Sequence, residues 1–344
     1  MKRVLSSSAE VRRKLDRFRA LRNDPAMSRE FALGIIESEA NPELLASALR
    51  ALGENVRPED GPLLRDLYHY FAESGRKRDA GGQLRAAVLG ALWHLRDSED
   101  LPLATAAART VERSFQGDGE MIRAAGLALL GVLDPGPATY LALAALGTLD
   151  AAEMSGEPAL TAIRLLGNLG HREPLALFVY QSAGATLPDL VAEAFRGLVG
   201  VPVTQLHPLI ELFDAPPPRR SRHLEDVAIL GLCDLLITLE LDPVVRSALN
   251  RFLNGSSIDV YAVLATSIVA SRRTELINLF LESLATEVSQ PRLRIALDAL
   301  RHAPPSPEVG AMIERLAQRE ANQPTLSDLA GTFDAEPEES ESED

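Results

Sequence analysis

The sequence has one cysteine, few aromatic residues and no hydrophobic run long enough to span a membrane. Cys233 is the only cysteine, so a disulfide framework and a cysteine-based zinc site are excluded, which favours a reducing, cytoplasmic setting. The longest apolar stretch, residues 227–241, is about 15 residues long, whereas a membrane span needs about 20. This stretch therefore predicts a buried helix. Residues 1–6 also lack the apolar core of a signal peptide, so we expect a soluble, cytoplasmic protein.

Strand signals are also missing. No run of alternating β-branched residues occurs, and aromatic residues make up only 5% of the chain. Hydrophobic residues nevertheless reach 46%, and most of them are leucine and alanine, which suit helices that pack closely on helices. The composition therefore predicts an all-α fold.

One apolar position recurs along the chain at a nearly constant interval. We call its residues the column: Leu49, Leu89, Leu127, Leu166, Leu198, Leu232, Thr266 and Leu300. By subtraction, the steps between them are 40, 38, 39, 32, 34, 34 and 34 residues. A period of this size is typical of stacked helical pairs. We therefore predict an α-solenoid of about eight helical pairs with irregular loops.

Prolines mark where these helices begin. Proline is tolerated in the first turn of a helix because the N–H it lacks would have no partner there. Prolines precede several column positions, and another proline follows most of them and should open the next helix. The second set is Pro62, Pro102, Pro137, Pro174, Pro208 and Pro243.

At residues 118–131 the chain resembles the HEAT-repeat family, including its short bacterial variety first noted in phycobilin lyases. Asp118, Arg123, Leu127 and Gly131 are similar to the family's pattern of an acid, an arginine, a leucine and a glycine. Looser versions around Leu166 and Leu198 extend the resemblance over roughly residues 30–318. It implies a protein-binding, armadillo-like solenoid in which arginines brace loop acids of adjoining repeats. The resemblance also implies a possible enzymatic function, because HEAT-like proteins include bilin lyases and base-excising DNA glycosylases.

Three regions follow from the pattern. Residues 1–25 predict a basic amphipathic helix that caps the array, with Ser7 and Glu10 at capping-box spacing. Residues 26–320 predict the solenoid, and residues 321–344 a disordered acidic tail. Besides capping, the basic helix has two further interpretations: docking to an acidic partner, such as the chain's own tail, or weak association with anionic lipid.

Charge is distributed unevenly. The net charge is −14, but residues 333–344 carry seven acids and no base, and residues 1–30 carry nine bases against four acids. The body between them is therefore about −12 (−14 + 7 − 5). This balance argues against nucleic acid as the partner, and it favours a protein partner of basic or mixed charge. The tail is expected to contact a basic partner or the N-terminal helix.

Several basic residues are candidates for contact with a protein partner. Some lie close to the column, and others lie in two loops, residues 73–82 and 215–223, which we expect to be mobile because they are rich in glycine or proline. The candidates are Arg76, Lys77, Arg78, Arg85, Arg123, Arg164, Arg196, Arg219, Arg220 and Arg222. For the arginines beside the column, bracing of neighbouring repeats is the competing interpretation.

No residue pattern predicts a catalytic, metal or cofactor site. The six histidines lack metal-ligand spacing, and Cys233 lies in an apolar run where cysteine acts as a small core residue. The aromatic side chains within residues 67–71, with the basic residues that follow, could stack on nucleic-acid bases, but such aromatics more often fill the core.

The leading hypothesis is thus a non-enzymatic scaffold or adaptor that binds a partner protein on the solenoid surface, in a signalling or regulatory complex. A HEAT-like enzyme, of the bilin lyase or DNA glycosylase type, is the alternative. In a third hypothesis the acidic tail competes with a partner for its site.

Overall fold

The computed structural model describes residues 4–113, 117–182, 187–212 and 222–321. In these ranges the chain is helical and has no strand; isolated bridges join Val4 to Glu39 and Ala151 to Pro158. The all-α prediction is confirmed. The chain divides into two compact units, Met1–Val201 and Pro202–Asp344, which we call unit 1 and unit 2. The predicted acidic tail and the tip of the 215–223 loop lie outside the described residues.

The described part of unit 1 consists of short helices. The helices are α1 (Ser8–Ala20), α2 (Pro25–Ser38), α3 (Pro42–Leu52), α4 (Gly61–Ala72), α5 (Gly75–Arg78), α6 (Gln83–Leu95), α7 (Leu101–Ala107), α8 (Glu120–Leu133), α9 (Pro135–Gly147), α10 (Ala159–Asn168), α11 (Arg172–Ser182) and α12 (Pro188–Gly197). Single 3-10 turns lie at Gly53–Asn55, Pro58–Asp60 and Ser98–Asp100.

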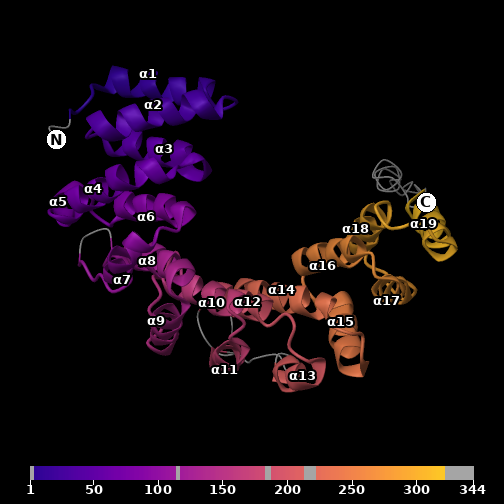
Figure 1. Ribbon diagram of the computed structural model, residues 1–344. Coiled ribbons are helices and arrows are strands. Elements are labelled where there is room, and N and C mark those ends of the chain that lie inside the picture. The colour runs from indigo at the N-terminus through magenta and orange to yellow at the C-terminus, as the bar shows by residue number, and fades with distance from the viewer. Residues whose placement is uncertain (1–3, 114–116, 183–186, 213–221, 322–344) are drawn as a thin grey trace, which may run out of the picture. The chain divides into compact units, whose positions relative to one another are not determined.

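The helices of unit 1 alternate between two layers (Figure 1). Helices α3, α6, α8, α10 and α12 carry the column and pack on one another in this order. We call them the column layer. Helices α2, α4, α7, α9 and α11 form the second layer, and each packs against the column helix that follows it. The predicted sequential packing of helical pairs is therefore confirmed.

Unit 2 repeats this alternation. Helices α14 (Arg222–Thr238), α16 (Ile258–Ser271) and α18 (Gln290–Leu300) carry the column, and α14 packs on α16, which packs on α18. Helices α13 (Val203–Leu212), α15 (Pro243–Gly255), α17 (Thr274–Leu284) and α19 (Pro307–Ala321) form its second layer.

The column positions lie in the core, with one correction. All seven column leucines are at most 3% exposed. Thr266 is exposed instead, and its hydroxyl donates to the carbonyl of Ala262, one turn earlier. The fully buried position beside it is Ala265. The spacing rule therefore misplaced the column in α16 by one residue, because a constant step of 34 cannot follow turns of unequal length.

A glycine explains how closely the two layers approach in unit 1. A Cβ on Gly126 of α8 would lie 2.4 Å from the backbone nitrogen of Ala108, at the end of α7. Only glycine fits this approach, because any side chain would force the helices apart. Small residues therefore decide the distance between paired helices, as the alanine-rich composition suggested.

Two local expectations were wrong. Pro208 does not open a helix, because α13 begins at Val203 and contains Pro208 in its interior. The loop of residues 73–82 is not wholly irregular, because it forms the short helix α5. Asp79 then anchors the loop by accepting hydrogen bonds from the backbone N–H groups of Leu84 and Arg85.

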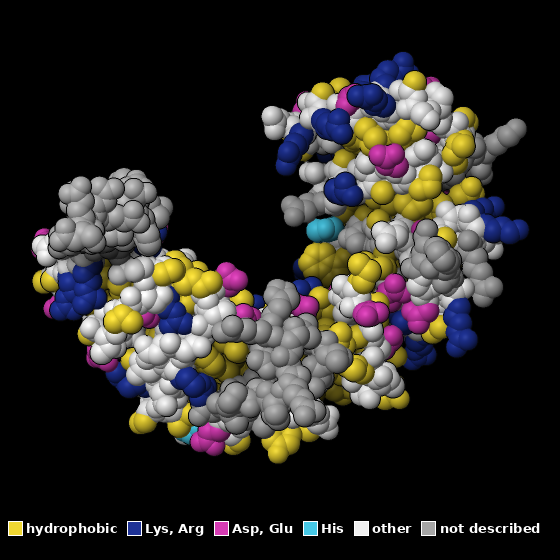
Figure 2. Space-filling view, turned by 180° about the vertical axis from the view of Figure 1, so that it is seen from behind, with side chains coloured by type: hydrophobic (Ala, Val, Ile, Leu, Met, Phe, Trp, Pro, Cys, Tyr) yellow, Lys and Arg dark blue, Asp and Glu magenta, His cyan; other side chains and the backbone are white. Residues whose placement is uncertain are grey.

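Helix α1 begins with the predicted capping box of Ser7 and Glu10, and it buries Val11. Lys14 on this helix pairs with the buried carboxylate of Glu39, at the end of α2. Other basic side chains of α1 remain at the surface, and Figure 2 shows Lys and Arg side chains gathered over this end of unit 1.

Candidate functional site

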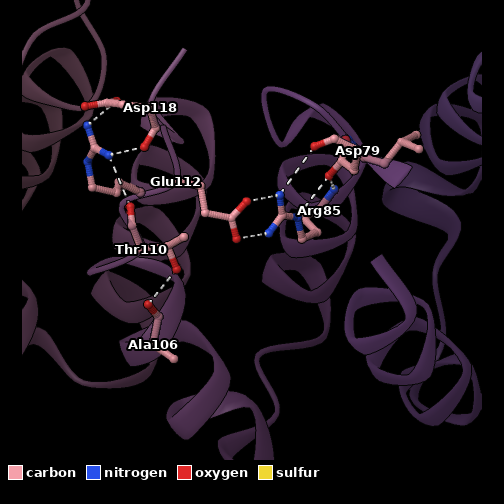
Figure 3. Close-up of polar contacts among 8 residues, drawn as sticks. Asp79, Arg85, Ala106, Thr110, Glu112 and Asp118 are labelled. Carbon is pink, nitrogen blue, oxygen red and sulfur yellow. Dashed lines mark hydrogen bonds and ion pairs between the residues drawn. The ribbon is translucent and has the colours of Figure 1, made fainter. Parts of the chain in front are cut away.

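Arg85 occupies the centre of a buried cluster between successive column helices (Figure 3). Its side chain is fully buried; Nε donates to Asp79 at 3.0 Å, and Nη1 and Nη2 donate to the two oxygens of Glu112 at 2.6 and 2.8 Å. A Cβ on Gly75 would lie within 3 Å of both Arg85 and Glu112, so α5 closes over the pair. Arg85 therefore braces the array.

Arg123 has the same role one repeat later. Nε and Nη2 donate to the two oxygens of Asp150 at 2.9 and 2.8 Å, and Nη2 also donates to Asp118. Nη1 donates to the carbonyls of Thr110 and Asp118. Burial would lower the pKa of this guanidinium, but the two carboxylates raise it above its usual range. Arg123 stays charged and joins three turns of unit 1.

The remaining candidates are placed as follows. Lys77 is exposed, and the guanidinium of Arg78 stacks 4.1 Å from the ring centroid of Tyr70. Arg219 and Arg220 lie outside the described residues, as do the side chains of Arg76 and Arg222. Arg164 and Arg196 are about half exposed, and the structure brings them together.

Arg164 and Arg196 line a surface hollow of about 500 Å³ in the column layer. Arg164 Nε donates to one oxygen of Glu193 at 2.9 Å, and Arg196 Nη1 donates to the other at 3.2 Å. Burial would raise the pKa of Glu193, but the two guanidinium groups lower it, so the carboxylate is ionised. Arg172 lines the same hollow and donates to the carbonyl of Gly167. We call this site the arginine hollow.

A second cavity, of about 450 Å³, lies between α4 and α7. Its charged lining is largely committed to internal pairs: Arg65 Nε donates to Asp100 at 2.6 Å, and Arg65 Nη1 donates to Glu99 at 2.9 Å. Tyr68, from the aromatic run, lies in its wall and is itself buried. The aromatic run therefore fills the core at Tyr68 and Phe71.

Helices α9 and α11 expose apolar side chains. Tyr140 and Leu143 of α9 are 69% and 39% exposed, and Leu177 and Tyr180 of α11 are 56% and 60% exposed. A contact of 3.3 Å between Thr139 Oγ1 and His171 Nε2 joins the start of α9 to the start of α11. We call these four side chains the α9–α11 apolar surface.

His207 and Cys233 lie in surroundings that indicate a structural role. Nε2 of His207 lies 2.6 Å from Asp242, at the start of α15; burial would raise the pKa of Asp242, but a backbone N–H and His207 lower it. Burial raises the pKa of Cys233 well above its usual range, so its thiol is protonated and unreactive. Among the described residues, no group of three or more His, Cys, Asp or Glu is placed to hold a metal ion.

No helix in the described part of the chain is both long enough and apolar enough to cross a bilayer. No protein-family model matches the chain, and no curated protein or solved structure matches it.

Sequence reasoning missed Arg172 and the α9–α11 apolar surface. Arg172 lies at no fixed distance from the column, so the periodicity gave no signal for it. The apolar surface did leave a signal, because residues 135–147 contain no charged residue at all. A helix without charge is either buried on all sides or exposes an apolar face.

Proposed function

We propose that this chain is a HEAT-repeat scaffold without enzymatic activity, which binds a partner protein in a signalling or regulatory complex. The observation that carries the proposal is the α9–α11 apolar surface, with Tyr140 and Tyr180 each at least 60% exposed. Large exposed apolar areas mark sites of protein association, and these four side chains come from two helices that are linked through Thr139 and His171.

The composition of this surface suits a protein partner. Tyrosine is enriched at energetically dominant positions of interfaces because its ring is large and rigid and its hydroxyl can still form a hydrogen bond. Leu143 and Leu177 add aliphatic area beside the two rings. A partner that covers these side chains removes apolar area from water, which contributes about 25 cal/mol per Å².

Two features support the HEAT assignment within this proposal. Arginines at the starts of α6 and α8 pair with carboxylates of the following repeat, as the resemblance implies. The column helices also pack in sequence within each unit. The single buried thiol of Cys233 fits a reducing, cytoplasmic setting.

The test is affinity capture of the full chain from its native cell, followed by cross-link mapping. The variant Tyr140→Ser with Tyr180→Ser should lose the captured partner, because both aromatic anchors are removed without creating a buried cavity. The control is Val288→Ser, which changes a side chain that is 84% exposed in unit 2.

An unchanged set of captured proteins in the double variant would refute the role of this surface. Small-molecule turnover by the chain, with no captured partner, would favour the HEAT-like enzyme instead. Changes in bilin absorbance and duplex binding at low salt are the readouts for the two enzyme types.

A further inference from the structure

The cavity of about 450 Å³ between α4 and α7 is lined by Asp100, a fully buried acid. Oδ1 of Asp100 accepts from Arg65 Nε at 2.6 Å, but Oδ2 has no hydrogen-bond partner among the described residues and is shielded from water. A buried acceptor without a donor is unfavourable. Rotation about χ2 of an aspartate is soft, so a small turn of the carboxylate presents Oδ2 to a donor that enters the cavity.

The equivalent acid of the preceding repeat shows that the fold itself does not require this spare acceptor. Asp60 and Asp100 occupy the same position in the motif Glu-Asp-x-Pro-Leu, which occurs in two successive repeats. Both oxygens of Asp60 accept from Arg29 Nη2, at 2.6 and 2.8 Å, and Oδ2 also accepts from the backbone N–H of Arg57 at 2.8 Å. Of the two acids, only Asp100 keeps an oxygen without a donor among the described residues.

The ion pairs beside this cavity contain more negative than positive charge. Two arginines, Arg65 and Arg85, pair with five carboxylates; the pairs of Arg85 are drawn in Figure 3. The five are Asp79, Asp97, Glu99, Asp100 and Glu112. The balance of these groups is −3 (2 − 5). A cation in the cavity offsets the repulsion among the carboxylates, whereas an anion would add to it.

The wall of the cavity combines apolar area with further acceptors. Most of its exposed surface is apolar, and the apolar residues that line it are Ala72, Pro102, Leu103 and Ala106. Tyr68 and Glu99 also line it, and each has an oxygen that accepts no hydrogen bond within the described part of the chain. A primary ammonium group has three N–H donors, which match these two oxygens and Asp100 Oδ2.

We propose that this cavity binds a primary ammonium group on an apolar stem, carried either by a small alkylamine or by a lysine side chain of a partner. The ammonium donates to Asp100 Oδ2, Tyr68 and Glu99, and the stem lies along the apolar wall. Hydrogen bonds between an ammonium and a carboxylate are charge-assisted and stronger than neutral ones. The site is separate from the α9–α11 apolar surface and does not depend on the scaffold proposal.

The first test measures binding of n-hexylammonium to the full chain by a ligand-observed NMR titration. n-Hexanol has the same stem without the charge, and it should bind at least about tenfold more weakly, because the charge-assisted hydrogen bonds are lost. Raised salt should weaken the amine more than the alcohol. Equal binding of the two probes, or no binding of the amine, would overturn the proposal.

Variants then locate the binding site. Asp100→Asn should weaken n-hexylammonium binding at least about tenfold, because the carboxylate that receives the ammonium is neutralised. The matched control is Asp60→Asn, which makes the same change at the equivalent acid and should leave the affinity unchanged. Unchanged affinity in Asp100→Asn, or an equal loss in Asp60→Asn, would contradict the assignment.

A third variant keeps the test decisive when Asp100→Asn does not fold, as judged by circular dichroism. Ala106→Leu adds volume to an exposed position of the cavity wall and alters no ion pair. It should weaken n-hexylammonium binding at least about tenfold, because the stem and the added side chain compete for one space. Full affinity in this variant would place the amine elsewhere.

A peptide arm distinguishes the two sources of the ammonium group. The probe is a blocked pentapeptide with one central lysine between alanines, and its analogue carries an acetylated lysine. Displacement of n-hexylammonium by the first peptide but not by the second identifies a lysine side chain as the occupant. Binding of the amine without displacement by either peptide identifies a small alkylamine.

Discussion

The two units stabilise successive repeats with the same residue type but with different acceptors. In unit 1, buried or partly buried arginines donate to carboxylates of the following repeat: Arg29 to Asp60, Arg65 to Asp100, Arg85 to Glu112 and Arg123 to Asp150. In unit 2, Arg273 and Arg292 donate to backbone carbonyls of earlier helix ends, and the ion pair of Arg246 with Glu282 of the following repeat is exposed. Arg273 Nη1 donates to Ile237 and Leu239 at 2.6 and 2.7 Å, and Arg292 Nη1 to Leu253 and Asn254 at 2.8 Å.

This difference has a physical consequence. The last carbonyls of a helix have no partner within the helix, so an arginine that binds them satisfies groups that water would otherwise have to solvate. A carboxylate acceptor instead creates a buried ion pair, which is costly to break because one charge is left behind. Loss of an arginine should therefore affect unit 1 more than unit 2.

The largest effect is expected for Arg85→Ala. It leaves the buried Asp79 and the partly exposed Glu112 without their cation, which should destabilise unit 1 by about 3–5 kcal/mol. Urea unfolding followed by circular dichroism measures this loss. A loss below about 1 kcal/mol, within the range of surface pairs, would show that the cluster is not a brace.

A smaller effect is expected for Arg273→Ala in unit 2. The two carbonyls at the end of α14 lose their donor, and unit 2 should be destabilised by about 1–3 kcal/mol. Urea unfolding followed by circular dichroism measures this loss of stability, and the loss measured for Arg85→Ala is the reference for comparison. A loss as large as that of Arg85→Ala would remove the distinction between the two kinds of acceptor.

Acid should weaken the contact between Lys14 and Glu39 in unit 1. Burial would raise the pKa of Glu39, but hydrogen bonds from Lys14 and Ser6 lower it below its ordinary value of 4.5. Its stabilising contribution is therefore present above about pH 4.5 and is lost as the pH falls through the lowered pKa. In a urea-denaturation series from pH 7 downward, the free energy of unfolding should fall less steeply below about pH 4.5 in Glu39→Gln than in the wild type. An equal decline in wild type and variant would contradict the assignment.

The smallest effect is expected for Thr266→Leu in α16 of unit 2. Because Thr266 is exposed, this change should alter stability by no more than about 0.5 kcal/mol. Leu232→Ala, at a buried column position of the same unit, should cost about 2–5 kcal/mol. A thermal melt of both variants measures these changes in stability. A large gain in stability for Thr266→Leu would contradict the correction and would place residue 266 in the core.

Some of the candidate site could be predicted from helix geometry alone. Arg85 and Arg123 lie four residues before their column leucines, a rotation of about 400°, which returns them to the buried face. Arg164 and Arg196 lie two residues before theirs, a rotation of about 200°, which turns them to the opposite face. The sequence thus contained the distinction between buried and exposed arginines, although their partners could not be read from it.

The sequence by itself determined the all-helical class, the repeated helical pairs and the capping box of α1, because each depends on residues close together in the chain. Only the tertiary structure decided which acid each arginine binds, where Gly167 and Gly197 let α10 and α12 approach each other, and that α9 and α11 expose apolar side chains. These features depend on the distance and rotation between helices about 30 residues apart. Those are set by side-chain packing across the layers, which the spacing of leucines does not specify.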